Sequence, residues 1–273
     1  LTLLSVGNAE VIELDDLLVE RAEVTDGSLA LTVGGDLVAT LAKASADATL
    51  NISGFGVLEK LSSGGNLSVE TGSLLEVSDL SGDSGEVISG GTTKLIAGLT
   101  DLILVSVGDT EVIESDDLLV KSAEVTEGSL DVIVGGNLSI DSARIAEDAT
   151  LLVADSANIS ELEASDGSLS LTVGGDLTAT LAKASSDATL KVSGFGVLDE
   201  LSSGGDVVID TGGFLEVSDL SGQSGVVTSG GTTKLTGSLE DLTLVSSGDA
   251  EVTESDDLLV KSAEVTEGSL DMI

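Results

Sequence analysis

Pairs of adjacent aspartates are the clearest candidates for binding chemistry in this chain. Each pair follows a glutamate in one of three related segments, "ELDDLLV" and two copies of "ESDDLLV". The candidate ligands are Asp15, Asp16, Asp116, Asp117, Asp256 and Asp257, preceded by Glu13, Glu114 and Glu254. Clustered carboxylates offer the hard oxygens that Ca²⁺ prefers, although a calcium ion takes about six to eight of them. The sequence therefore predicts weak, distributed Ca²⁺ binding. The alternative is a solvated turn in which carboxylates cap backbone N–H groups.

Other short motifs offer less chemistry. The GGxGxDxUx nonapeptide of calcium-binding β-rolls is absent. The segment "GGTTKL" at Gly90 and Gly230 lacks the spacing of a phosphate-binding loop. Four glycosylation sequons begin at Asn51, Asn66, Asn137 and Asn158. We interpret these asparagines as turn residues, because the slots of the first two hold Lys and Asp in a second copy of the segment.

Several residue types that enzymes rely on are missing. The chain contains no Cys, His, Pro, Trp or Tyr, and only three Phe and one Met. It therefore has no imidazole base, no thiolate nucleophile and no ordinary zinc site. Carboxylate pairs on β-helices do cleave glycosides in some enzymes. An active site would, however, interrupt the repeat with a loop, and no insertion separates the two long copies. We expect no enzyme, no catalytic residue and no cofactor other than Ca²⁺.

Charge limits the partners of the chain. Ten Lys and Arg against 49 Asp and Glu give a net charge of −39 over 273 residues. Such a surface excludes nucleic acid, whose phosphates require basic residues. The apolar runs are too short to span a membrane. A self-repelling surface of this kind suits an exterior rich in salt or calcium, and a role in solubility alone is the alternative.

Internal repeats dominate the organisation. Residues 28–133 align without gaps to residues 168–273 at an offset of 140, and further matches occur at offsets of 101 and 39. These offsets approximate seven, five and two multiples of 20, so a unit of about 20 residues underlies them. We predict a single continuous domain over residues 1–273, with a 140-residue super-repeat at residues 28–167 and an incomplete one at residues 168–273. Because both ends fall inside repeats, we expect a fragment of a longer repeat protein.

Short segments alternate apolar and polar residues and are separated by Gly, Ser, Asp and Asn, which is typical of strands joined by tight turns. We expect the turn glycines to supply positive φ. Apolar exchanges between the copies predict buried positions at Val69 and Ile209, Ile52 and Val192, Leu67 and Val207, and Leu74 and Phe214. Exchanges of an apolar residue for Thr predict exposed positions at Val38, Ile88, Ile96, Ile103 and Ile113, which become Thr178, Thr228, Thr236, Thr243 and Thr253. The core should be Leu and Val, and the outer face Thr, Ser, Asp and Glu.

A unit of this length with two or three strands, stacked at ~4.8 Å on the next, predicts an all-β parallel β-solenoid of about 14 rungs. We expect a right-handed coil. Bulky rings fit poorly into a thin stacked core, which accounts for the scarcity of aromatic residues. Proline would be excluded because neighbouring rungs use nearly every backbone N–H.

The segments "VGGDLTATL", "VGGNLSIDSA", "SGGDVVIDTGG" and "SDDLLVKSAEVTEGSL" resemble the repeats of filamentous-haemagglutinin-like bacterial surface exoproteins, over essentially the whole chain. The resemblance implies a secreted β-solenoid shaft without catalytic residues, part of a surface fibre, sheath or adhesin stalk at the cell surface. Expected partners are copies of the chain, laterally or end to end, and cell-surface glycans or cations. The alternative function is a calcium- or glycan-binding adhesion module of a cell-surface or S-layer-like protein.

Overall fold

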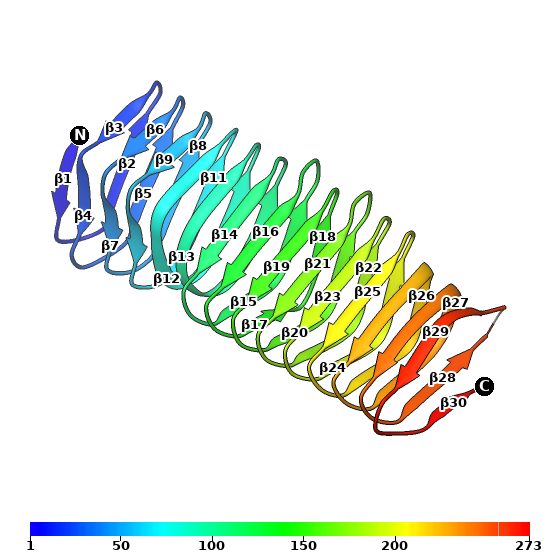
Figure 1. Cartoon of the computed structure of the whole chain (residues 1–273). Helices are drawn as coiled ribbons and strands as arrows, with labels where there is room; N and C mark the ends of the chain where they lie inside the picture. Colours follow the sequence, from blue (N-terminus) through cyan, green and yellow to red (C-terminus); the bar gives the residue numbers. More distant parts are fainter. Residues whose placement is uncertain (256) are drawn as a thin grey trace. The chain divides into compact units, whose positions relative to one another are not determined.

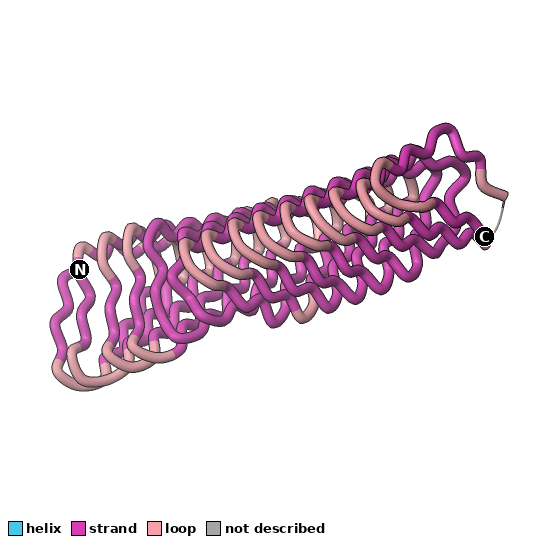
Figure 2. The backbone as a smooth tube through the Cα atoms, turned by 60° about the horizontal axis from the view of Figure 1, so that its bottom comes forward, coloured by secondary structure: helices cyan, strands magenta, loops and turns pink. Residues whose placement is uncertain are grey.

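The computed structural model describes residues 1–255 and 257–273, and this part of the chain consists of strands and turns without a helix (Figure 2). It divides into two compact units, Leu1–Val134 and Gly135–Ile273. Both units are parallel β-solenoids, and together they hold about 14 turns about 19 residues apart. The predicted fold class is confirmed. The continuity of one domain over residues 1–273 stays a prediction.

Strands of the first unit, blue to green in Figure 1, are β1 (Thr2–Ser5), β2 (Ala9–Glu13), β3 (Leu17–Val19), β4 (Arg21–Val24), β5 (Leu29–Val33), β6 (Leu37–Ala39), β7 (Ala42–Ala44), β8 (Ala48–Ile52), β9 (Gly56–Leu58), β10 (Leu61–Ser63), β11 (Asn66–Thr71), β12 (Leu75–Ser89), β13 (Thr93–Ser106), β14 (Thr110–Glu114), β15 (Leu118–Val125) and β16 (Leu130–Val134). Strands of the second unit are β17 (Leu138–Ile140), β18 (Ala143–Ile145), β19 (Ala149–Val153), β20 (Ala157–Ala164), β21 (Leu169–Val173), β22 (Leu177–Ala184), β23 (Ala188–Val192), β24 (Gly196–Ser203), β25 (Val207–Thr211), β26 (Leu215–Ser229), β27 (Thr233–Ser246), β28 (Ala250–Glu254), β29 (Leu259–Val265) and β30 (Leu270–Met272).

One turn of the first unit runs along one side of the solenoid and returns along the other (Figure 1). β5 forms the first side, residues 34–36 turn the corner, and β6 and β7 form the second side before β8 begins the next turn. β5 pairs with β8 and β6 with β9, in parallel register. Bonds between turns continue through the corners, where the Gly34 N–H donates to the Glu13 carbonyl at 2.8 Å. Because the next turn uses these N–H groups, proline would break the ladder.

The core is built by alternate residues that point inward. In β5, Leu29, Leu31 and Val33 are 1%, 0% and 1% exposed, while the residues between them face outward. Leu31 is in register with Leu50 of the next turn, so identical side chains stack along the unit. Burying one such leucine contributes about 1.5–3 kcal/mol.

The two predicted faces are largely confirmed. Val69, Ile209, Ile52, Val192, Leu67 and Val207 are buried, and Val38, Ile88, Ile96 and Ile103 are exposed, whereas Ile113 is half-buried. Leu74 and Phe214 were predicted to be buried, and this is wrong: each is 37% exposed. Each directly precedes the first inward residue of a strand, Leu75 or Leu215, and the alternation therefore turns it outward.

Polar residues also enter the core, at the corner that follows the C-terminal end of β11, β12 and β13. Ser89 and Ser106 are 1% and 0% exposed and donate their hydroxyls to the carbonyls of Ser73 and Gly91 at 2.8 and 2.9 Å. Thr93 Oγ1 lies 3.0 Å from Ser106 Oγ. The expectation of a purely aliphatic core is therefore wrong at this corner, where hydroxyls bond carbonyls that the tight turn leaves inside.

Turn length varies along the chain, so the 101-residue offset does not correspond to the five whole turns that were predicted. Thr71 pairs with Ser89 and Ser89 with Ser106, steps of 18 and 17 residues, because β12 and β13 run around a corner without a separate loop. Five steps from Ala9 pass through positions 29, 48, 67 and 85 to Leu102. β14, the repeat of β2 at an offset of 101, lies half a turn further, on the other side. The predicted five turns are thus five and a half.

Candidate functional site

The first aspartate pair lies in the corner between β2 and β3. Asp16 Oδ1 accepts the backbone N–H of Asp36, one turn further along, at 2.9 Å. Glu13 Oε1 accepts the N–H of Leu14 at 3.0 Å. Asp15 is exposed to solvent. Two of the three carboxylates in this segment therefore hold backbone N–H groups, which is the turn-capping alternative.

The second pair lies in the corner between β14 and β15, and here the preceding glutamate is buried. Glu114 is 2% exposed. Its Oε2 accepts the N–H of Leu99, a buried donor, at 2.9 Å, and its Oε1 accepts the N–H of Ser115 at 2.9 Å. Asp116 and Asp117 are exposed. Glu114 thus replaces a backbone carbonyl where the corner of β13 has no matching strand above it.

In the third segment Asp256 lies outside the described residues. Asp257 is exposed and borders a hollow of about 310 Å³ that Ser221, Gln223 and Glu240 also line. Glu254 repeats the role of Glu114, since its Oε2 accepts the N–H of Leu239 at 3.3 Å.

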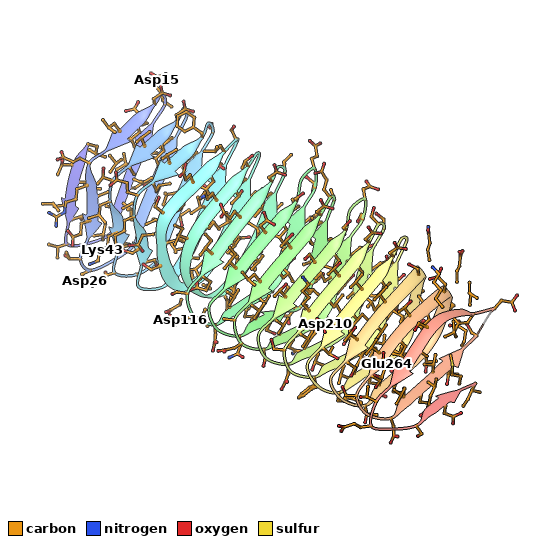
Figure 3. All side chains as sticks on the ribbon, viewed as in Figure 1. Asp15, Asp26, Lys43, Asp116, Asp210 and Glu264 are labelled. Carbon is orange, nitrogen blue, oxygen red and sulfur yellow. The ribbon has the colours of Figure 1, made fainter. Side chains whose placement is uncertain are left out.

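The described carboxylates do not assemble into a metal centre. In the part of the chain covering residues 1–255 and 257–273, no group of three or more Asp and Glu side chains has the geometry to hold an ion. Within the first unit, Asp15 and Asp116 lie at opposite edges (Figure 3). This separation follows from the half-turn offset of their segments. Calcium binding at the six aspartates stays a prediction.

The structure instead assigns a repeated role to Asx side chains at the corners. The side-chain Oδ1 of an Asn or Asp in one turn accepts the backbone N–H of a residue in the next turn, about 19 residues on. The pairs, donor first, are Ser28 with Asn8, Asp36 with Asp16, Phe55 with Asp36, Asn66 with Asp47, Ser129 with Asp109, Ser156 with Asn137, Ser168 with Asp148, Phe195 with Asp176, Asp206 with Asp187 and Ser269 with Asp249, at 2.7–3.2 Å. We name this set the Asx ladder.

The ladder explains some of the turn glycines. A Cβ on Gly65 would lie 2.5 Å from Asp47 Oδ1, the atom that accepts the N–H of the following Asn66. Positive φ is not the reason for these glycines, because among the described residues only Gly27 has it. That expectation was wrong: glycine is needed so that the carboxylate below can approach the backbone.

Among the described residues, Lys94 on β13 and Asp249 at a corner have shifted pKa values. The backbone N–H and the hydroxyl of Ser269 donate to Asp249 Oδ1 at 2.8 and 2.9 Å, and these hydrogen bonds hold the pKa of the Asp249 carboxyl below its usual range. The hydrogen bond and the charge of Glu111, whose Oε2 lies 2.7 Å from Lys94 Nζ, raise the pKa of the Lys94 ammonium. Both shifts favour the charged forms.

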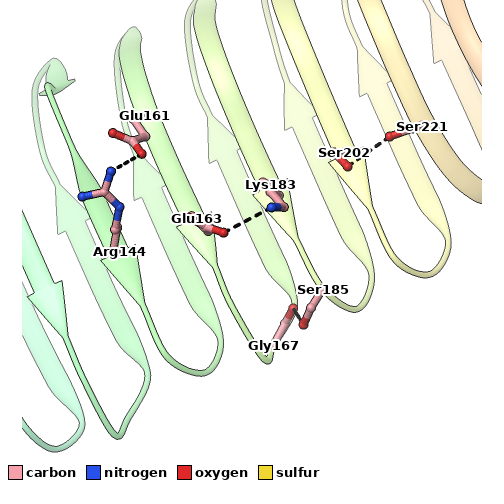
Figure 4. A network of polar contacts seen from close by, with 8 residues as sticks. All are labelled: Arg144, Glu161, Glu163, Gly167, Lys183, Ser185, Ser202 and Ser221. Carbon is pink, nitrogen blue, oxygen red and sulfur yellow. Dashed lines mark hydrogen bonds and ion pairs between the residues drawn. The ribbon is translucent and has the colours of Figure 1, made fainter.

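Most basic residues pair with an acid on a neighbouring turn. In the second unit Arg144 pairs with Glu161 at 2.5 Å and Lys183 with Glu163 at 3.3 Å, while Ser221 donates to Ser202 at 3.0 Å (Figure 4). These contacts span 17–20 residues of sequence, which is one turn. Exposed pairs of this kind are worth about 0.2–1 kcal/mol each. They fix the register between turns and neutralise few of the acids.

Comparison with family models, with curated proteins and with solved structures finds no match to this chain. No helix in the described residues is long and apolar enough to cross a membrane. The fold and the Asx ladder therefore define the class of molecule, a parallel β-solenoid whose repeats are held together at the corners by side-chain caps.

Proposed function

We propose that this chain is a structural, non-catalytic segment of the shaft of an extracellular surface fibre, sheath or adhesin stalk, of the kind the filamentous-haemagglutinin-like repeats form. The Asx ladder is the observation that carries the proposal. It adds a charge-assisted or amide bond to the backbone ladder at corners of both units, so the turns that it joins are held to each other by bonds along the direction in which a shaft is loaded.

The arrangement of charge supports the same role. The side chains of the Asx ladder are short Asn and Asp residues at the corners. Most other acids, although not the buried Glu114, lie outward and keep a long repeat soluble. The two copies of the super-repeat run through without an insertion. A shaft needs such uniformity, because every turn has the same mechanical task.

The test is the location of the chain on intact cells. Antibodies raised against residues 28–167 should label the outside of non-permeabilised source cells by immunogold electron microscopy, on surface projections or a sheath. Label that appears only inside permeabilised cells would overturn the proposal.

A matched variant tests the structural role. Deleting residues 48–66 removes one turn and joins Asp47 to Leu67, which is in register with Ala48. We expect this shortened chain to fold and to reach the surface as the parent does, since a shaft loses only length. Loss of surface label with the fold intact would contradict a role that depends on repetition alone.

A further inference from the structure

Part of one side of the second unit is almost free of charge. This area covers β19, β21, β23, β25, residues 225–229 of β26 and residues 242–246 of β27, which pair in this order in parallel register. The outward residues form two rows across the six strands. They are Thr150, Ser170, Thr189, Val208, Val226 and Thr243 in one row, and Leu152, Thr172, Lys191, Asp210, Thr228 and Val245 in the other. We name these twelve residues the Thr/Val face.

The Thr/Val face contrasts with the rest of the chain. Its only charges are Lys191 and Asp210, which cancel, whereas the chain carries a net charge of −39. Leu152, Val208 and Val226 are 46%, 37% and 44% exposed on it. The other side of the same unit presents acids in most of its strands, at Glu161, Glu163, Asp199, Glu200, Glu216, Asp219 and Glu251. Two copies of so acidic a chain can approach closely only where charge is absent.

We propose that the Thr/Val face binds the same face of a second copy of this chain, around a two-fold axis that runs parallel to the strands between β23 and β25. That axis lies at the middle of the six strands, with three on each side. It brings Lys191 opposite Asp210 of the second copy, and Asp210 opposite the second copy's Lys191. A two-fold interface requires such self-complementary pairs.

The two charged side chains are available for this pairing. Lys191 and Asp210 are neighbours in register on β23 and β25, and both are exposed. Among the described residues, Lys191 forms no ion pair within its own chain, although eight of the ten basic residues do. Because a two-fold rotation exchanges the two positions, the ammonium of each copy meets the carboxylate of the other.

The size of the face predicts a weak contact. Six strands at ~4.8 Å and five residues at ~3.3 Å give about 29 by 16 Å, hence about 900 Å² over both copies. Stable complexes bury about 1,200–2,000 Å², so this contact alone is transient. Salt should strengthen it, because screening removes repulsion between the acidic surfaces around it. This lateral contact deepens the proposed function and rests on it for its role, since shafts that lie side by side would use it.

The first unit offers a natural comparison. The equivalent positions on β8, β11 and the C-terminal part of β12 hold Asn51, Glu70 and Glu86 in place of Lys191, Asp210 and Val226. A two-fold rotation there would place Glu70 opposite Asn51 and Glu86 opposite Ala30, so neither acid would meet a basic residue. Self-association should therefore belong to the second unit.

The experiment is sedimentation velocity on the full chain over a range of concentrations, in low salt and in about 0.5 M NaCl, where the Debye length is only ~4 Å. We expect a reversible dimer that is favoured by salt. The variant Val208→Glu/Val226→Glu should be monomeric, and the control Val38→Glu, at a 42% exposed valine of the first unit, should dimerise as the parent does. Circular dichroism verifies that each variant is folded.

Charge exchange tests the axis. Lys191→Asp or Asp210→Lys alone should raise the dissociation constant by about fivefold, as expected for the loss of two exposed ion pairs. The double exchange should restore it. A monomer under all conditions, a dimer indifferent to Val208→Glu/Val226→Glu, or a double exchange without rescue would overturn the proposal. The sedimentation results do not depend on where the chain is located in the cell. Conversely, immunogold label found only inside cells would overturn the surface role without affecting the evidence for a dimer, so the two proposals can fail separately.

Discussion

The contact between Gly65 and Asp47 makes a prediction in which the effect of one substitution changes sign. Asp47 Oδ1 accepts the N–H of Asn66 at 2.9 Å, and a Cβ on Gly65 would lie 2.5 Å from this oxygen. The next nearest atom, a backbone carbon of Ala46, would be 3.5 Å away, an ordinary contact. The carboxylate alone therefore excludes alanine.

The magnitudes follow from two opposing effects. Alanine at position 65 displaces the carboxylate and loses a cap worth about 1 kcal/mol. It also reduces the conformational freedom of the unfolded chain, which stabilises the fold by about 0.5 kcal/mol. We expect Gly65→Ala to lower the free energy of unfolding by about 0.5 kcal/mol in the parent. In an Asp47→Ala background the cap is already lost, so the same change should raise the free energy by about 0.5 kcal/mol.

The assay is a double-mutant cycle by urea denaturation, with hydrogen exchange of the Asn66 amide as the local measurement. Gly72→Ala is the control, because its Cβ would meet the backbone carbonyl oxygen of Ser53 and should destabilise the chain in both backgrounds. If Gly65→Ala destabilises the Asp47→Ala chain as well, the reasoning about the Asx ladder is wrong.

Three further outcomes are expected. The pKa of the Asp249 carboxyl is lowered in the folded chain, so its contribution to stability is present above the unfolded pKa of 3.8 and is lost as pH falls through the lower folded pKa. Denaturation measured between neutral and acid pH should therefore show this loss in the parent, and Asp249→Asn should remove it. Glu114→Ala should cost about 1–3 kcal/mol, because the buried Leu99 N–H loses its acceptor, and Glu254→Ala should cost less because that side chain is only half-buried. If cation binding is distributed, added calcium should raise the melting temperature gradually, and the heat of calcium binding to Asp116→Asn/Asp117→Asn should differ little from that of the parent. A single saturating high-affinity site that this variant loses would contradict distributed binding.

The fold could be predicted because its information is local and repeated. Alternation of apolar and polar residues fixes which side chains point inward, and the comparison of the two copies separates buried positions such as Ile52 from exposed ones such as Val38. The comparison wrongly predicted burial of Leu74, because the exchange of Leu74 for Phe214 at a corner resembles an apolar exchange at a buried strand position. The comparison also missed the burial of the Ser89 and Ser106 hydroxyls, because a small polar residue can be buried only where the corner brings a carbonyl acceptor near it.

The candidate site was less accessible to sequence. The turn-capping alternative could be stated, but not which donor each carboxylate reaches, since Asp16 and Asp36 are 20 residues apart and meet only when the turn length is known. A signal for the ladder does exist in the sequence. A Gly followed by the donor residue recurs 18–20 residues after an Asn or Asp, as in Asp47 and Gly65.

Closely similar segments of the chain take different roles because turns of unequal length surround them. "AEVIE" of β2 and "TEVIE" of β14 share the inward valine and glutamate, yet Glu13 is half-buried and Glu114 is 2% exposed. Above β13 the short corner leaves the N–H of Leu99 without a backbone acceptor, and the Glu114 carboxylate fills that place. Since both sides of a turn use the same alternation of inward and outward residues, a segment can move by half a turn without losing its core. The corner it meets there then decides whether its acid only caps its own corner, as Glu13 does, or also accepts an N–H of the preceding turn, as Glu114 does.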